Sequence, residues 1–161
     1  MKRPSEISTM EIVFNKWIPF GNYLALTLFG KAYINNSNKS LWEKYVANGN
    51  ANIVKNHEMI HVKQAQFTDN SWLKFYWKYI CEWLKNQPWR YGTEFACFCN
   101  PFEMEAYQNE LNLSYNTNKS IGAYDWVRLS RYSLNQRLSI WKDFLQSKKS
   151  SFGQYLRDSS I

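Results

Sequence analysis

The chain has 161 residues, of which 45 % are hydrophobic and 18 % aromatic, and a net charge of +7. This length fits one domain with a buried core and excludes two large domains, and the apolar content excludes a disordered chain. The nearest approach to a membrane-spanning run, Tyr23–Gly30, is far shorter than the ~20 residues required, and the first residues lack a secretory pattern. Three cysteines, with Cys97 and Cys99 too close for an ordinary disulfide, favour a reducing compartment. We therefore expect a globular cytoplasmic protein.

The first part of the chain contains two segments that favour β-structure. Residues 1–10 show no apolar period and predict a loose arm. Glu11–Ile18 and Tyr23–Ile34 are rich in β-branched and aromatic residues, and Pro19–Asn22 between them has the composition of a turn. The pattern therefore predicts a small N-terminal β-hairpin.

Beyond this hairpin the apolar residues follow a helical period. Ser71 or Asn70 is suited to the N-cap of one helix, and Pro101 to the first position of another, with Asn100 as its cap. The residues from Gly92 to Asn100 are expected to form a loop. Helices are expected over Ser40–Tyr45, from Ala51 for about four turns, and over Trp72–Leu84, Pro101–Leu113 and Trp126–Gln146. The predicted fold class is mainly α (α+β).

Positive charge is concentrated at the C-terminal end. Residues 1–125 contain 13 Lys/Arg against 11 Asp/Glu, whereas residues 126–161 contain 7 against 2. We therefore expect one domain over residues 1–125 and a basic, helical C-terminal extension over 126–161, with a polar tail from Ser147.

The segment Trp72–Leu84 is apolar or aromatic except for one narrow polar stripe. Its members are Lys74, Lys78, Glu82 and Lys85, spaced four, four and three residues apart. A core helix with one wet side is the favoured interpretation. The alternative is an interfacial helix that lies on a membrane, because such helices combine aromatic residues with lysine.

Both histidines of the chain fall in the HExxH pattern, at His57 and His61. On a helix this spacing projects both imidazoles from one face, within reach of one Zn²⁺ ion. Glu58 is rotated by about 100° from His57, so it is unsuited as a third ligand. It is placed instead to accept a proton from a metal-bound water and to carry it to the leaving group. The pattern predicts a catalytic zinc site with Glu58 as general base.

A catalytic zinc needs a third protein ligand and an open position. Without another histidine, the candidates are carboxylates or cysteines. Glu103 and Glu105 differ by about 200° around a helix axis, so only one of them can face the metal. Cys97 and Cys99 would complete a structural site, but paired zinc thiolates are typically separated by two to four residues. Ordinary buried thiols are the favoured interpretation of this pair.

The residues from Asn56 to Gln64, the aromatic helix after them and Asn100–Tyr107 resemble a family of small HExxH proteins common in Bacteroidetes-like bacteria. Trp17–Phe20 and Leu26–Phe29 are similar to the N-terminal hairpin of that family, so the resemblance covers about residues 12–115. These proteins are similar to gluzincin-type zinc metallopeptidases. The resemblance implies a zincin-like helical domain with a small hairpin beside the HExxH helix.

In gluzincins, the two histidines of HExxH and the glutamate of a later E-x-x-A motif bind the metal. The resemblance therefore implies Glu103, three residues before Ala106, as the third ligand beside His57 and His61. Glu105 and Tyr107 are then second candidates, either as a ligand or as contacts of the ligands. The better-known gluzincins have Ala-Asp where this chain has Ala106 and Tyr107.

The expected function is hydrolysis of peptide bonds by metal-activated water, with an edge strand within Tyr23–Ile34 binding an extended peptide or protein substrate. The alternative is a non-enzymatic, zinc-braced subunit of a larger assembly such as a bacteriophage particle, which would be virion-associated and bind partners through the basic C-terminal region. Nucleic-acid binding by that region is the weaker interpretation, because a solvated helix face explains most of its basic residues.

Overall fold

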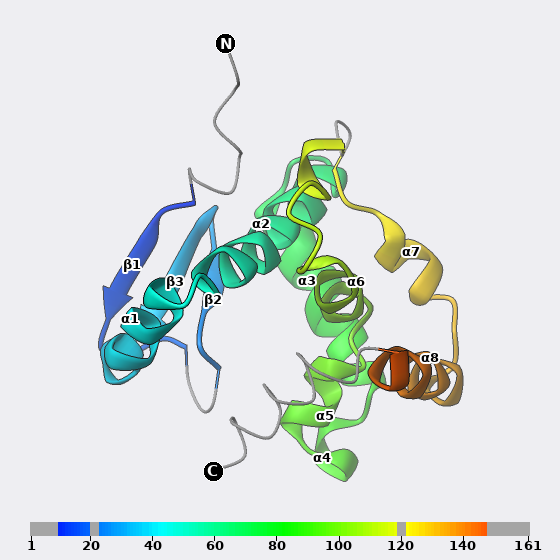
Figure 1. The fold of residues 1–161 in the computed structure, drawn as a ribbon. Helices are drawn as coiled ribbons and strands as arrows, with labels where there is room; N and C mark the ends of the chain where they lie inside the picture. Colours follow the sequence, from blue (N-terminus) through cyan, green and yellow to red (C-terminus); the bar gives the residue numbers. More distant parts are fainter. Residues whose placement is uncertain (1–9, 20–22, 119–121, 148–161) are drawn as a thin grey trace.

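Helix α2 (Ala51–Phe67) runs through the middle of the molecule, with a small sheet on one side and most other helices on the opposite side (Figure 1). This computed structural model describes residues 10–19, 23–118 and 122–147. The strands are β1 (Ile12–Asn15), β2 (Leu26–Leu28) and β3 (Lys31–Asn35). The remaining helices are α1 (Lys39–Ala47), α3 (Trp72–Lys85), α4 (Pro88–Tyr91), α5 (Thr93–Phe98), α6 (Pro101–Asn109), α7 (Asp125–Leu129) and α8 (Leu134–Ser147), with short 3₁₀ turns η2 (Asn36–Asn38) and η3 (Asn116–Asn118). The mainly α (α+β) fold class is confirmed.

The sheet has the strand order β1-β3-β2, in which β1 runs parallel and β2 antiparallel to β3. The expected single hairpin around Pro19–Asn22 is therefore wrong in its pairing, and residues 20–22 lie outside the described residues. The observed hairpin turn is Phe29–Gly30, where both residues have positive φ angles of 48° and 84°. Such a pair forms the two-residue turn whose twist matches that of the flanking strands. This turn leaves β2 at the edge of the described sheet.

The start of α6 is fixed against α3 and α2. Asn100 caps the helix by accepting a hydrogen bond from Phe102 N, and its amide donates to Tyr79 O of α3 at 3.1 Å. Phe102 is fully buried and stacks on Trp126 of α7, with ring centroids 4.3 Å apart. Gln64 of α2 donates to Phe102 O at 2.9 Å. These contacts hold the first turn of α6 against three other helices.

Two expectations are wrong, one about the segment before α6 and one about where α6 ends. The segment from Gly92 to Asn100 is not a loop, because α5 forms there and buries Ala96, whose carbonyl accepts from the buried Asn86 side chain at 2.8 Å. Helix α6 ends at Asn109 instead of Leu113. The chain turns away from the helix axis there, and the Asn56 side-chain amide of α2 donates hydrogen bonds to three of its carbonyls, those of Asn109, Glu110 and Asn112. In both cases a contact with a distant residue determines the local structure.

Helices α7 and α8, which belong to the expected basic extension, pack into the same body as the rest of the chain. Trp141 of α8 shares a buried cluster with Met104 of α6 and Leu129 of α7. Arg137 is buried and pairs with Glu82 of α3 at 2.8 Å, so it is not available to a nucleic acid. Of the loose arm expected over residues 1–10, residues 1–9 lie outside the described residues, as do residues 148–161 of the expected tail. The expectation is wrong for Met10, which is 4 % exposed and packs with Ala32 and Met59. No helix in the described part of the chain is long and apolar enough to span a membrane.

Gly122 is predicted to be irreplaceable, because a Cβ atom there would lie 2.4 Å from Lys63 O and 2.6 Å from Phe67 N of α2. Both contacts are with helical backbone, which cannot move aside. Gly122→Ala should therefore lower the free energy of unfolding by about 2–4 kcal/mol. Gly49→Ala is the control, since Gly49 has a similar positive φ but open space around it, and it should cost only about 1–2 kcal/mol. Urea unfolding of both variants measures the difference; equal losses would show that the contact with α2 has no role.

Candidate metal centre

His57 and His61 project from the same face of α2, and their ring centroids are 5.0 Å apart. Both are nearly buried, with exposed fractions of 8 % and 6 %. Glu103, in the first turn of α6, lies opposite them. Its two carboxylate oxygens divide between the rings: Oε2 lies 3.2 Å from His57 Nε2, and Oε1 lies 3.5 Å from His61 Nε2. Residues distant in the sequence thus converge through one nitrogen of each imidazole and one shared carboxylate.

These distances fit a tetrahedral metal ion. Two ligand atoms that each lie ~2.0–2.1 Å from Zn²⁺ at a tetrahedral angle are separated by about 3.3 Å. The ligand atoms of His57, His61 and Glu103 all lie within 4.8 Å of one another. Within the described ranges, neither Cys97 nor Cys99 belongs to such a group. The donor set is therefore that of a two-histidine, one-carboxylate site.

The second nitrogen of each imidazole is also fixed. His57 Nδ1 lies 2.9 Å from Glu110 Oε2, and His61 Nδ1 lies 2.8 Å from Gln64 Oε1. An oxygen acceptor at Nδ1 keeps the hydrogen there and leaves the Nε2 lone pair for a metal. Neither Glu110 nor Gln64 is among the site residues predicted from the sequence. A signal existed, because Glu110 follows Glu103 by seven residues, about two helical turns, and Gln64 follows His61 by three.

The electrostatics of the cluster favour an ionised Glu103 carboxylate that shares protons with the imidazoles of His57 and His61. Burial alone would raise the pKa of Glu103, but the imidazoles of His61 and His57 hold it well below its usual range. Burial opposes protonation of His57, yet hydrogen bonds with Glu103 and Glu110 raise the pKa of His57 well above its ordinary value. The pKa of His61 is likewise raised, against burial, by Glu103. If both imidazoles are neutral, the carboxylates of Glu103 and Glu110 leave two negative charges next to them. A divalent cation would balance these charges.

Tyr79 of α3 completes the surroundings of Glu103. Its hydroxyl donates to Glu103 Oε1 at 2.7 Å. Burial, together with the charge of Glu103, raises the pKa of Tyr79 well above its usual value, so the phenol remains a donor. The aromatic helix after the HExxH helix therefore contributes a direct contact to the cluster.

Glu105 does not reach the cluster. It is fully buried and accepts hydrogen bonds from the Tyr115 hydroxyl at 2.6 Å, the Gln64 side chain at 2.9 Å and the Asp125 backbone at 3.0 Å. Its place is therefore behind Gln64, which in turn contacts His61. Tyr107, the other second candidate, packs its ring edge-on against His57 with centroids 4.6 Å apart.

Glu58 is 5 % exposed and points toward the sheet. Its Oε2 accepts a hydrogen bond from Thr27 Oγ1 of the edge strand β2 at 2.5 Å. The charge of this carboxylate is one of the smaller causes that raise the pKa of His61. Thr27 was not identified from the sequence, because nothing in the chain links a strand residue to a helix residue 31 positions later.

Comparisons with known proteins provide no relative for this chain. No family model, curated protein or solved structure matches it. The resemblance to gluzincin-type proteins therefore stays a prediction. The function must therefore be inferred from the geometry of His57, His61 and Glu103 and from the residues that contact them.

We predict that the purified protein binds about one Zn²⁺ per chain, and that His61→Ala or Glu103→Ala removes it by weakening affinity by orders of magnitude. Glu43→Ala, at an exposed position on α1, is the matched control and should retain full zinc content. Elemental analysis after dialysis against a competing chelator measures both. Equal zinc in His61→Ala and the control would contradict the site.

The contact of Glu110 with His57 gives a graded version of the same measurement. Glu110→Ala removes the acceptor at Nδ1 but no metal-facing atom, so it should weaken zinc affinity by ~10–100-fold. A chelator titration resolves this intermediate effect from that of Glu103→Ala. If Glu110→Ala were the more damaging of the two, the assignment of Glu103 as ligand would be wrong.

Proposed function

We propose that the protein is a zinc-dependent peptidase whose metal is held by His57, His61 and Glu103. The observation that carries this proposal is the single carboxylate that faces both imidazole Nε2 atoms at 3.2 and 3.5 Å. A zinc ion held by these three residues would act as a Lewis acid and would lower the pKa of a bound water to roughly 7. The second nitrogen of each ring supports the proposal, because both are held by oxygen acceptors.

A catalytic site explains the cluster better than a structural one. Structural zinc sites use four protein ligands, whereas catalytic sites use three and keep one position open. In the part of the chain that the structure describes, no fourth His, Cys, Asp or Glu joins the group. Glu58 adds a second argument, because a structural zinc site does not require a buried carboxylate next to the ligands on α2.

Glu58 is the proposed general base. Its carboxylate would accept a proton from the attacking water and later deliver it to the leaving amine of the substrate. The Thr27 hydroxyl holds Glu58 Oε2 on the side of β2 and thereby limits its rotation. This contact leaves Glu58 Oε1 as the oxygen to take part in proton transfer.

The position of the edge strand β2 is the reason to propose a peptide as the substrate. Thr27 joins this strand to Glu58, so an extended chain paired with β2 would pass beside the HExxH helix. An exposed strand edge binds such chains through main-chain hydrogen bonds. We therefore propose extended polypeptide segments as the substrate class.

One observation favours the alternative of a non-enzymatic assembly subunit. Glu58 is already engaged by Thr27, and the cluster joins α2 to α6, so zinc there would also brace two central helices. In that case the protein would bind zinc with the same residues but hydrolyse nothing. Activity of the Glu58 variant separates the two proposals.

Glu58→Gln should lower peptide hydrolysis by about 10²–10⁴ while leaving zinc content and folding near wild type, because glutamine keeps the size but removes the base. Zinc-loaded wild type, Glu58→Gln and the exposed control Glu43→Gln are incubated with a diverse peptide library, and new termini are identified by mass spectrometry. The control should match wild type.

Equal cleavage by wild type and Glu58→Gln would remove Glu58 from the mechanism. Cleavage by none of the three proteins, with zinc present in all, would favour the zinc-braced assembly subunit.

A further inference from the structure

Helix α3 carries a second apolar face whose large side chains are exposed in the described structure. Its residues are Leu73, Trp77, Ile80 and Leu84, with exposed fractions of 77 %, 70 %, 48 % and 44 %. Their spacing of four, three and four residues aligns them along one side of the helix. The core-facing side of the same helix is occupied separately, for example by Phe75, which is 4 % exposed. The apolar residues of α3 thus exceed what its packing in the core requires.

The turn between β2 and β3 extends this surface. Phe29, at the tip of the turn, is 64 % exposed, and its ring contacts those of Trp72 and Tyr76 with centroids 6.3 and 5.7 Å away. Its backbone N–H donates to the Tyr76 hydroxyl at 3.0 Å, which fixes the turn against α3. We define the apolar face as Phe29, Leu73, Trp77, Ile80 and Leu84.

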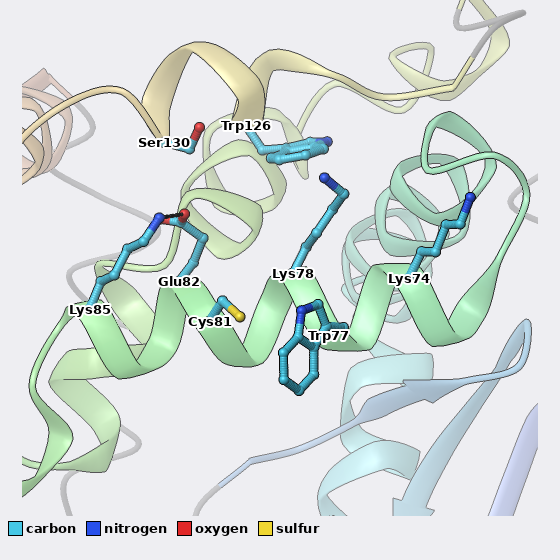
Figure 2. A pocket seen from close by; sticks show the side chains of 8 residues that line it. All are labelled: Lys74, Trp77, Lys78, Cys81, Glu82, Lys85, Trp126 and Ser130. Carbon is cyan, nitrogen blue, oxygen red and sulfur yellow. Dashed lines mark hydrogen bonds and ion pairs between the residues drawn. The ribbon is translucent and has the colours of Figure 1, made fainter.

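A row of lysines borders the apolar face on one side. Figure 2 shows Lys74, Lys78 and Lys85 along α3, with Trp77 projecting from the neighbouring side of the helix. These lysines line a hollow of about 370 Å³ between α3 and α7. Lys78 Nζ lies 5.7 Å above the ring of Trp126.

The acidic groups at the row do not cancel its charge. Glu82, the one acidic side chain that lines this hollow, is shared by Lys85 at 2.5 Å and the buried Arg137 at 2.8 Å. Lys74 pairs with Asp69 at 2.6 Å, and no ion pair among the described residues involves Lys78. The three lysines of the row thus outnumber the carboxylates of Asp69 and Glu82, and Glu82 is shared with Arg137, so the border of the apolar face is positive.

The distribution of charge selects among the possible occupants of this face. In a symmetric antiparallel pair of α3 helices, the lysine side of one copy meets the lysine side of the other, and the like charges repel. On the other flank of the face lie Trp72 and Tyr76, which stack on each other and offer no negative charge to the lysines of a parallel partner. The occupant must therefore be apolar at its centre and negative at its border.

We propose that the apolar face and its lysine row dock the protein on the surface of an anionic lipid bilayer. Leucine, isoleucine and aromatic side chains on one side of a helix enter the boundary of the headgroups and acyl chains, while adjacent lysines contact the anionic headgroups. Tryptophan is enriched at the boundary between membrane and water, and Trp77 lies at the centre of the apolar face. The proposal goes beyond the proposed peptidase function and does not depend on the zinc site.

Vesicle co-sedimentation of the full chain tests the proposal. The protein is mixed with vesicles of phosphatidylcholine alone or with about one third phosphatidylglycerol, at low and high salt. Binding to the anionic vesicles is expected, with weaker binding at high salt because screening reduces the lysine contribution. Trp77→Ser combined with Ile80→Ser should weaken this binding roughly tenfold or more. Lys74→Glu combined with Lys78→Glu should abolish the preference for anionic vesicles.

The control is Trp17→Ser, because Trp17 is as exposed as Leu73, at 77 %, but follows β1 instead of lying on α3. It should bind like wild type, and circular dichroism checks that every variant is folded. Failure of wild type to bind anionic vesicles overturns the proposal. Equal binding by Trp77→Ser/Ile80→Ser and wild type also overturns it, because adsorption would then come from the net charge elsewhere. A dimer in sedimentation velocity that this double variant dissociates, without vesicle binding, would assign the face to a second copy.

Discussion

The contact between Glu103 and the two imidazoles of α2 is the constraint around which the structure is organised. A buried charge costs several kcal/mol unless it is paired and its hydrogen-bonding atoms are satisfied. Glu103 meets this requirement through His57, His61 and Tyr79. This pairing requires that the start of α6 keep its position. Asn100 holds it there, because it caps α6 and donates a hydrogen bond to α3. Small shifts of α6 against α2 would break the pairing, which explains why polar contacts join these two helices at both ends.

Buried polar side chains around the cluster hold the residues that contact the two imidazoles. The Asn56 side-chain amide donates to three carbonyls of the chain that carries Glu110, and Asn116 donates to the Asn56 side-chain oxygen at 2.8 Å. Gln64 links His61 to the buried Glu105. Burial raises the pKa of Glu105, although the hydrogen bonds that it accepts act in the opposite direction. Such hydrogen-bonded networks favour a single arrangement of side chains and hold the orientation of the imidazoles.

The hairpin of β2 and β3 connects two surfaces that the sequence leaves unrelated. Thr27 contacts Glu58 beside the cluster, and Phe29, two residues later, packs on α3. Alternation along the strand sends one residue toward the HExxH helix, and the turn sends the other toward the exposed apolar face. A bilayer on that face and a peptide on the strand edge would therefore both contact the same short hairpin.

Features with a local cause were predictable from the sequence, and those that depend on distant contacts were not. The Ser71 cap and the HExxH spacing predicted α3 and the shared face of His57 and His61, and helix geometry showed that only one of Glu103 and Glu105 faces the histidines. Resemblance, not geometry, selected Glu103. The parallel pairing of β1 with β3 and the early end of α6 escaped prediction, because each depends on residues far apart in the chain.

Anomalous diffraction at the zinc edge, from crystals of the zinc-loaded protein, tests the central claim most directly. The account predicts one strong peak per chain, ~2.0–2.2 Å from His57 Nε2, His61 Nε2 and a Glu103 oxygen, with a fourth position not filled by protein. A peak held by Glu105 or a cysteine, or a fourth protein ligand in the coordination sphere, would contradict the proposed catalytic centre.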